Sequence, residues 1–425
     1  MRVFMLGWEF PPFITGGLGT ACYGLTKAMD QLGIKVIFVL PTMAQSDFAT
    51  HVRLLSPVHQ VSQAASKFST LKNVTFRAIG SSLQPYLTPD DYRRQIEETL
   101  RQKHPTTDAQ FMTSFDYCGD MYAEVNRYAA LAAQLAEKER FDVVHAHDWM
   151  TYPAGIMVAK MSGKPLIVHV HSTEFDRSGE NVNQMIYDIE RQGMHAADKI
   201  IAVSFLTRNI IIHRYGISGE KVEVVHNGVE RNGDADLDLT GSGIKRDERI
   251  VLFLGRITMQ KGPEYFLQAA KKVLNVMDNV KFVMAGSGDL MHRAVEMAAE
   301  LGIGQKVLFT GFLRGEDVRK IYRMADLYVM PSVSEPFGIA PLEALNNDVP
   351  VIISKQSGVS EVLKHALKVD FWDTDEIANK VIAVLKYPSL RETLANYGNF
   401  EVRKLRWIDT AQKCAKIYQE LLVPV

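Results

Sequence analysis

The 425-residue sequence is poor in cysteine and has no long hydrophobic run. Its three cysteines, Cys22, Cys118 and Cys414, are far apart and odd in number, so they indicate neither a disulfide framework nor a metal site. The apolar run after Arg2 ends at Gly7, which is too short for a signal sequence, and no later run could span a membrane. These absences predict a cytoplasmic protein without an integral membrane segment.

An excess of basic charge is also missing. The chain has 48 Lys and Arg against 49 Asp and Glu, which gives a formal net charge of −1. Proteins that bind nucleic acids normally carry a basic face, so we expect no nucleic-acid partner. The length and the 47% hydrophobic content are sufficient for two domains that each have their own core.

Short apolar runs alternate with amphipathic segments along the chain. The first half is expected to hold strands at residues 3–6, 35–40, 142–145, 165–170, 199–203 and 222–225, and the second half at 250–254, 281–285, 307–309, 327–330 and 349–353. Strand, turn, helix and strand in succession are typical of a doubly wound α/β domain, so the sequence predicts two Rossmann-like domains. Polar residues 230–247 indicate an exposed linker, which places the domains at about 1–229 and 230–407.

A glycine-rich turn follows the first expected strand. Gly16 and Gly17 precede a helix expected from about Thr20 to Leu32, and ligands bind at this end of the strands in such sheets. The dinucleotide spacing G-x-G-x-x-G is absent. The glycines alone are equally consistent with a turn that requires positive φ angles.

Histidines end two neighbouring strands of the first half. His145 and His147 end one strand, and His169 and His171 end the next. A strand end is where a parallel sheet presents side chains to a ligand, which makes His147 a candidate binding residue. Alternation along a strand puts each pair on one face and allows a zinc site in principle, but no carboxylate or cysteine spacing supports one. We therefore expect no metal.

Two carboxylates, Glu335 and Glu343, flank a Pro-Phe-Gly triplet after a buried strand. Pro336 favours the first turn of a helix, expected from about Phe337, so Glu335 would lie beside a helix N-terminus that attracts anions. Arg256 and Lys261 lie together in another strand-to-helix loop. They could be a surface pair, but two fixed positive charges there also suit a diphosphate leaving group. A phosphorylated sugar fits this combination.

Five motifs together carry a resemblance to a known family. They are Thr15-Gly16-Gly17-Leu18, His145-Ala146-His147-Asp148-Trp149, Arg256 with Lys261, Glu335 to Glu343 in an E-x7-E pattern, and Ser357-Gly358-Val359-Ser360-Glu361. The chain resembles retaining GT-B glycosyltransferases of the glycogen synthase and family 4 type over essentially its whole length. The resemblance implies two Rossmann-like domains that face each other across a cleft, with a C-terminal helix at about 408–425 that crosses back to the N-terminal domain.

The resemblance also implies site residues. The implied catalytic residues are His147, Arg256, Lys261 and Glu335. The implied nucleotide-sugar-binding residues are Gly16, Gly17, Leu18, Phe337, Gly338, Ile339 and Glu343. Arg256 and Lys261 would hold the diphosphate, and Glu343 the ribose. Glu335 and His147 would contact the transferred sugar from opposite domains, and the glycine-rich turn would close over the phosphates.

The implied reaction is transfer of a hexosyl unit, specifically glucosyl, from ADP- or UDP-glucose to an α-glucan with retention of configuration. A departing phosphate oxygen takes the acceptor proton, and neither a cofactor nor a metal is required. The acceptor would be framed by residues 42–118 and the loop after His171, a loop closer to family 4 transferases.

Three alternatives remain at the level of the sequence. A family 4 transferase could act on a small-molecule, lipid-linked or exopolysaccharide-precursor acceptor. Residues 89–103 have the charge of a membrane-surface helix but lack a continuous apolar face, which disfavours the membrane-bound form. A non-enzymatic sugar-binding module would not need Arg256, Lys261, Glu335 and His147 together. A phosphorylase would need a pyridoxal phosphate lysine and a longer chain.

Overall fold

The computed structural model describes residues 1–10, 16–42, 72–80, 121–230 and 248–422. Several sequence expectations concern other residues and so lie outside the described part. They are Thr15 of the first loop, most of the acceptor segment 42–118, the charged segment 89–103, and the linker after residue 230.

The first half of the chain forms a seven-stranded parallel sheet in the order β3-β2-β1-β4-β5-β6-β7. Its strands are β1 (Arg2–Leu6), β2 (Lys35–Thr42), β3 (Val74–Gly80), β4 (Val143–His147), β5 (Leu166–Val170), β6 (Lys199–Ala202) and β7 (Val222–Val224). The central strands β4 and β5 are buried at every residue, because a parallel sheet is covered by helices on both faces.

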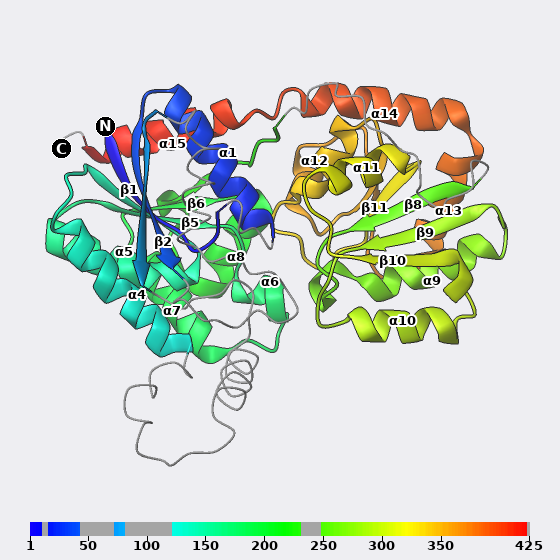
Figure 1. The fold of residues 1–425 in the computed structure, drawn as a ribbon, viewed down its shortest axis with the longest axis horizontal. Helices are drawn as coiled ribbons and strands as arrows, with labels where there is room; N and C mark the ends of the chain where they lie inside the picture. The colour runs from blue at the N-terminus through cyan, green and yellow to red at the C-terminus, as the bar shows by residue number, and fades with distance from the viewer. Residues whose placement is uncertain (11–15, 43–71, 81–120, 231–247, 423–425) are drawn as a thin grey trace, which may run out of the picture.

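Two groups of helices cover this sheet (Figure 1). The helices are α1 (Gly17–Gln31), α4 (Met121–Ala136), α5 (Tyr152–Ser162), α6 (Glu174–Ser178), α7 (Gln184–Ala196) and α8 (Phe205–Tyr215), with short 3-10 turns η2 (Trp149–Thr151) and η3 (Gly219–Lys221). Helices α4, α5 and α7 pack side by side on one face, and α1 lies on the other.

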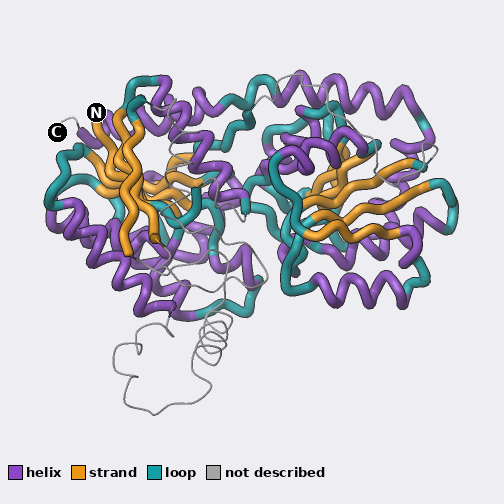
Figure 2. The backbone as a smooth tube through the Cα atoms, viewed as in Figure 1, coloured by secondary structure: helices purple, strands orange, loops and turns teal. Residues whose placement is uncertain are grey.

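The second half repeats the arrangement with six parallel strands in the order β10-β9-β8-β11-β12-β13. The strands are β8 (Arg249–Leu254), β9 (Val280–Ala285), β10 (Val307–Gly311), β11 (Leu327–Met330), β12 (Val351–Ser354) and β13 (Leu367–Val369). The helices are α9 (Pro263–Leu274), α10 (Met291–Glu300), α11 (Glu316–Met324), α12 (Ile339–Asn346), α13 (Thr374–Lys386) and α14 (Pro388–Val402), with turns η4 (Met259–Lys261), η5 (Gly304–Lys306) and η6 (Gly358–Glu361). Figure 2 shows both sheets enclosed by helices, which confirms the predicted pair of Rossmann-like domains.

The last helix returns to the first domain. The chain runs along the second domain as α14 and then crosses back as α15 (Trp407–Leu422), which packs against α1 and ends on the same side as the N-terminus (Figure 1). Gly24 of α1 allows this contact, because a Cβ there would lie 2.2 Å from the indole ring of Trp407. The predicted crossing helix is thus observed, and a glycine on α1 makes room for it.

Three element bounds differ from the sequence expectations in ways that affect the site. Helix α1 begins at Gly17 rather than near Thr20, and β4 extends to His147 because this residue still pairs with His169. Helix α12 begins at Ile339 rather than Phe337, because Gly338 has a φ of 103°, which ends the loop in a left-handed conformation.

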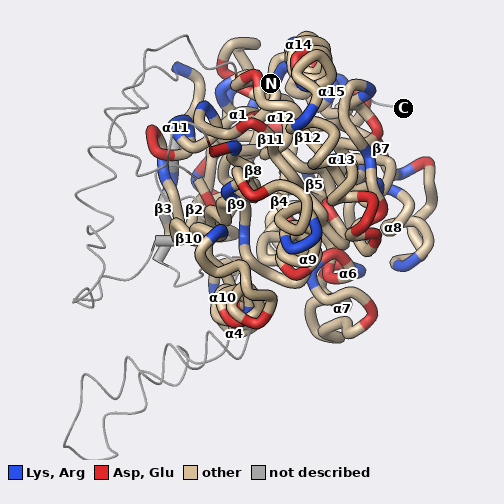
Figure 3. Tube along the Cα trace, turned by 90° about the vertical axis from the view of Figure 1, so that its right-hand side faces the viewer, with Lys and Arg blue, Asp and Glu red and all other residues tan. Residues whose placement is uncertain are grey.

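Charge and hydropathy of the described residues agree with the composition. Positions of Lys and Arg and positions of Asp and Glu are interspersed along the trace in Figure 3. Within the described ranges, every helix is too short or too polar to cross a lipid bilayer.

Candidate active site

The two domains touch through polar contacts at the carboxyl ends of their strands. The hydroxyl of Ser334, in the loop after β11, donates a hydrogen bond of 2.6 Å to the Asp176 carboxylate on α6. Ile339, the first residue of α12, packs against the cores of both domains. The Glu335 loop of the second domain therefore lies directly against the loop that follows β5 in the first.

A buried ion-pair network fixes the position of α6. Arg177 donates to Glu174 at 3.1 Å and to Glu190 of α7 at 2.6 Å. Asp176 closes the first turn of α6, since its second carboxylate oxygen accepts hydrogen bonds from the backbone N–H and the hydroxyl of Thr173. The carboxylate that receives Ser334 is thus held by its own helix and does not depend on the second domain.

Lys261 and Glu335 form an ion pair in the second domain. Lys261 ends the turn η4, and its side chain is 18% exposed, whereas that of Glu335 is 9% exposed. Arg256, in the same loop, donates a hydrogen bond of 3.0 Å to the Gln260 side chain. The structure thus brings the loop of Arg256 and Lys261 against the loop of Glu335, and the Val333 N–H also donates a hydrogen bond of 2.9 Å to the Gln260 carbonyl.

Backbone hydrogen bonds hold Glu335 and the Pro-Phe-Gly triplet against the β12–η6 loop. The Glu335 N–H donates to the Gln356 carbonyl at 3.0 Å, and the Gly358 N–H donates to the Glu335 carbonyl at 2.9 Å. The Val359 N–H donates to the Phe337 carbonyl at 2.6 Å, and the Phe337 ring is buried. The side chain of Phe337 therefore belongs to the core, and only its backbone is available to a ligand.

Glu343 lies inside α12 and faces the Tyr322 hydroxyl of α11 at 3.1 Å. Burial raises the pKa of Glu343, and the hydrogen bond from Tyr322 opposes that shift. A half-buried carboxylate in the middle of a helix, with one oxygen already held, can accept hydrogen bonds from a vicinal diol through the other.

The glycine-rich turn of the first domain already binds a carboxylate. Glu9 is 1% exposed and accepts hydrogen bonds from the backbone N–H groups of Gly16 at 2.8 Å and Gly19 at 3.3 Å. These groups belong to the N-terminus of α1, where the helix dipole favours an anion. Leu18 is buried in the first core. A donor phosphate at this turn would therefore lie beside Glu9.

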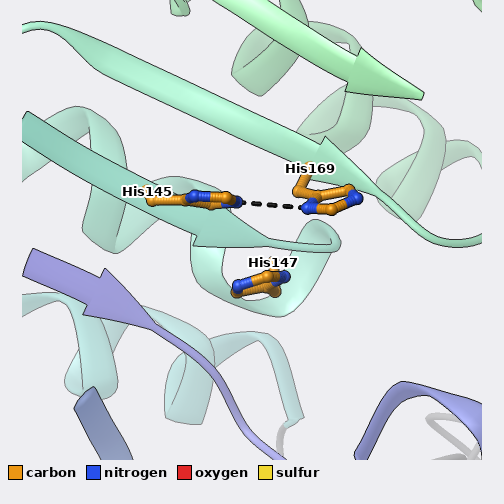
Figure 4. Close-up of side chains that lie close together, drawn as sticks. All are labelled: His145, His147 and His169. Atoms are coloured by element: carbon orange, nitrogen blue, oxygen red, sulfur yellow. Dashed lines mark hydrogen bonds between the residues drawn. The ribbon is translucent and has the colours of Figure 1, made fainter. Parts of the chain in front are cut away.

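His147 ends β4 and is part of a buried group of histidines (Figure 4). Its Nδ1 shares a hydrogen bond of 2.9 Å with Nε2 of His171, and Nε2 of His145 shares one of 3.2 Å with Nδ1 of His169. Burial lowers the pKa of His145 to about 3, with a further contribution from His171. Burial likewise lowers the pKa of His147 and His169, so these imidazoles are neutral at pH 7.

Asp148 follows His147 with a φ of 57°, which is unusual for a residue other than glycine. Its carboxylate accepts hydrogen bonds from the backbone N–H groups of His171 at 2.7 Å and Ser172 at 3.3 Å. Burial raises the pKa of Asp148 to about 7, against the effect of these hydrogen bonds. Asp148 thus links the ends of β4 and β5 and orients the chain on both sides of His147.

Comparison with known proteins identifies both halves of the chain. The family model Glycosyltransferase Family 4 matches residues 87–232, and the model Glycosyl transferases group 1 matches residues 235–399. The chain is a GT-B glycosyltransferase of the GT4 type.

Relatives of this glycosyltransferase differ in their named activities. It is 28% identical to an uncharacterised glycosyltransferase of Methanocaldococcus jannaschii over 436 residues, covering 99% of this chain and 98% of the relative. It is 22% identical to a glycogen synthase of Mycobacterium tuberculosis over 98% of this chain and 94% of that protein. It is 28% identical to D-inositol 3-phosphate glycosyltransferase 1 of Catenulispora acidiphila over 68% of this chain and 75% of that protein.

The fold of the glycosyltransferase matches solved structures along its whole length. Sucrose-phosphate synthase from Thermosynechococcus elongatus superposes with a TM-score of 0.72 at 19% identity, covering 99% of this chain and 98% of that one. This likeness shows the shared GT-B architecture of two facing Rossmann-like domains.

Some residues around the candidate site were not assigned a role from the sequence. They are Glu9, Asp176, Tyr322, Ser334 and Glu361. The sequence singled out the polar loop after His171 and the Ser357–Glu361 motif as segments of the site. It gave no sign that Ser334 contacts Asp176, because the two residues are 158 positions apart.

A cavity of about 850 Å³ lies at the opposite ends of the strands, beside Arg2 and Asp142, and contains none of the predicted site residues.

Proposed function

We propose that this glycosyltransferase transfers a glucosyl unit from a nucleotide sugar, ADP- or UDP-glucose, to an α-glucan acceptor with retention of configuration. The proposal rests on one observation above all. The hydrogen bond from Ser334 to Asp176 sets the Glu335 loop, with its Lys261 partner, against the first-domain loop that follows the histidine-bearing strands. Groups suited to a diphosphate and groups suited to sugar hydroxyls thus meet at one place between the domains.

In the proposed reaction, Lys261 and Arg256 stabilise the negative charge that grows on the leaving diphosphate. Glu343 accepts hydrogen bonds from the ribose diol, and Glu335 and the first N–H groups of α12, at Gly338 and Ile339, bind the transferred sugar. The helix N-terminus supports this role because its N–H groups lack intrahelical partners.

The acceptor hydroxyl attacks the face from which the nucleotide leaves, and a departing phosphate oxygen takes its proton. Neither a metal nor an organic cofactor takes part. His147 contacts the sugar from the first domain through Nε2, since its Nδ1 is bonded to His171, and this contact requires the groups that bury Nε2 to move aside. Closure of the two domains around the donor would exclude water and limit hydrolysis. We place this reaction in the cytoplasm.

The choice of an α-glucan acceptor is supported by the match to a glycogen synthase along nearly the full length of both chains. Purified protein incubated with ADP-glucose or UDP-glucose and glycogen should release nucleoside diphosphate and lengthen the glucan. The absence of chain elongation with both donors would overturn this acceptor assignment. Anomeric configuration of the new linkage, read by NMR of the product, tests retention.

A second candidate is sugar transfer to a small-molecule, lipid-linked or exopolysaccharide-precursor acceptor. It is favoured by the 28% identity to a D-inositol 3-phosphate glycosyltransferase. A donor panel scored for nucleoside diphosphate release, with glycogen, a polyol phosphate or a lipid-linked sugar added in turn, distinguishes the two. If a non-glucan acceptor stimulates the release of nucleoside diphosphate and glycogen does not, the second candidate is favoured.

A further inference from the structure

The histidines beneath α15 form a compact group of nitrogen ligands that the transfer reaction does not use in full. One ring nitrogen from each of His145, His147 and His169 lies within 4.8 Å of the others. All three side chains are at most 1% exposed. Figure 4 shows the rings of His145 and His169 pointing toward each other from neighbouring strands, with His147 to one side.

Two nitrogens of this group lack a partner. Among the described residues, Nε2 of His147 and Nε2 of His169 are buried without any hydrogen bond. An unsatisfied polar atom in a buried site is costly, and each one in a native structure calls for a reason. A metal ion that accepts an electron pair from Nε2 of His147 would supply that reason for His147, whereas His169 turns its other nitrogen, Nδ1, toward His145.

The spacing of the group fits one metal ion. Two imidazole nitrogens bound to the same tetrahedral zinc, at about 2.0–2.1 Å each, lie about 3.3–3.4 Å apart. Nε2 of His145 and Nδ1 of His169 are already 3.2 Å apart. The third nitrogen, from His147, lies within 4.8 Å of the other two and needs a shift of up to about 1.4 Å to reach the same spacing.

Outer hydrogen bonds of the group also match those of metal-bound histidines, which donate their second N–H to a fixed acceptor. Nδ1 of His145 contacts the Tyr418 hydroxyl of α15, and Nδ1 of His147 contacts Nε2 of His171. Each contact leaves Nε2 as the second ring nitrogen: Nε2 of His145 meets Nδ1 of His169, and Nε2 of His147 has no hydrogen bond. His171 is only half-buried, so the group lies close to solvent at the strand ends.

We propose that His145, His147 and His169 bind a single Zn²⁺ ion. Three neutral imidazoles suit zinc and disfavour Mg²⁺ and Ca²⁺, which prefer oxygen ligands. The sequence disfavoured a metal because no cysteine or carboxylate accompanies the histidines. The fold supplies His169 as the third ligand instead, because β4 and β5 are adjacent and parallel and place His169 beside His147.

Zinc at this site inhibits glycosyl transfer, because it occupies the Nε2 atom with which His147 contacts the sugar. This consequence rests on the proposed function, whereas zinc binding itself does not. The ion takes no part in the transfer reaction, so the metal-free protein is the active form.

Equilibrium dialysis of the chelator-treated full chain against ZnCl₂ tests the site. One zinc per chain is expected for the wild type and for His213→Gln, which changes an exposed histidine on α8, and none for His169→Gln. Circular dichroism and thermal unfolding verify that each variant is folded. Failure of the wild type to bind zinc, or unchanged binding by folded His169→Gln, overturns the proposal.

X-ray absorption of the wild-type zinc complex keeps the test decisive if the core variants do not fold. Three imidazoles at about 2.0–2.1 Å from zinc are expected, and a zinc shell dominated by oxygen would contradict the site. In the transfer assay, one equivalent of zinc should lower the rate at least tenfold, and chelation should restore it. Binding of one zinc without inhibition would retain the metal site and refute the sugar contact of His147.

Discussion

Lys261 and Glu335 form an ion pair that joins the two halves of the predicted donor site. The residues are 74 positions apart, and the sequence assigned them to different parts of the donor, the diphosphate and the sugar. The ion pair shows that the group expected to bind the diphosphate and the group expected to bind the sugar contact each other directly. Lys261 balances the Glu335 carboxylate in the form without donor, and a bound diphosphate would compete for the same ammonium group.

Lys261→Met is expected to reduce turnover with the nucleotide sugar by about 10²–10³-fold, because the leaving phosphate loses a fixed positive charge. The variant should also lose about 3 kcal/mol of stability, because the buried Glu335 carboxylate is left unpaired. Steady-state kinetics and urea denaturation measure both effects. Lys413→Met, on the exposed side of α15, is the matched control.

The double variant Lys261→Met with Glu335→Gln separates the two effects. Stability should return toward that of the wild type, since no unpaired charge remains, while turnover stays low. Recovery of turnover in the double variant would show that Lys261 acts only as the partner of Glu335.

Glu343→Ala is expected to raise the KM for the nucleotide sugar by about 10- to 100-fold, as hydrogen bonds to a charged group contribute about 1.5–3 kcal/mol. A donor that lacks the ribose 2′-hydroxyl should show the same loss with the wild type and little further loss with the variant. Tyr322→Phe keeps the carboxylate and removes one hydrogen-bond donor, so its effect should be smaller. Equal and additive losses from the variant and the deoxy donor would exclude a contact between Glu343 and the ribose.

Gly358→Ala tests the close approach of the domains. A Cβ at this position would lie 2.2 Å from the Pro336 carbonyl oxygen and 2.5 Å from Cβ of Ser204, in the other domain. We expect a loss of about 1–3 kcal/mol in the free energy of unfolding, as for other overpacked sites, and a larger radius of gyration in small-angle scattering. Gly304→Ala, where nothing lies within 4 Å of the new Cβ, should change neither.

Glu361 makes a pH-dependent contact between the domains. Its carboxylate accepts hydrogen bonds from the backbone N–H groups of Phe205 at 2.9 Å and Leu206 at 2.7 Å, at the N-terminus of α8. Burial tends to raise the pKa of Glu361, but hydrogen bonds from His226 and from these N–H groups outweigh it and lower the pKa below its ordinary value of 4.5. The folded state therefore favours the ionised carboxylate.

A lowered folded-state pKa means that the contact stabilises the protein above about pH 4.5 and that this contribution disappears as the pH falls further. Glu361→Gln should therefore be less stable than the wild type by about 1 kcal/mol at pH 6, with the difference shrinking toward pH 3.5. Thermal unfolding over this range measures the difference, with Glu392→Gln on the exposed side of α14 as control. A difference that is constant with pH would contradict the role of the ionised carboxylate.

Local patterns in the sequence were sufficient for the architecture. The apolar runs around Val143, Leu166 and Val251 predict buried parallel strands because both faces of such a sheet are covered. Pro263 marks the start of α9, since proline fixes the φ angle that a first turn requires, whereas Pro336 lies three residues before the start of α12. The two Rossmann-like domains followed from these signals, and the family resemblance from five motifs taken together, among them the spacing of Glu335 and Glu343.

Contacts between distant residues were decided only by the tertiary structure. The orientation of the two domains and the return of α15 to the first domain bring distant residues into contact. The contacts are Ser334 with Asp176, Lys261 with Glu335, and His145 with Tyr418 of the last helix. The side chains themselves carry no signal of their partners, since a hydroxyl, a carboxylate or an imidazole fits many environments. The sequence by itself determined which strands and helices form, since these depend on local backbone preferences and on the period of burial. The packing of the two domains determined which polar groups share a site, because that depends on how complete surfaces fit together.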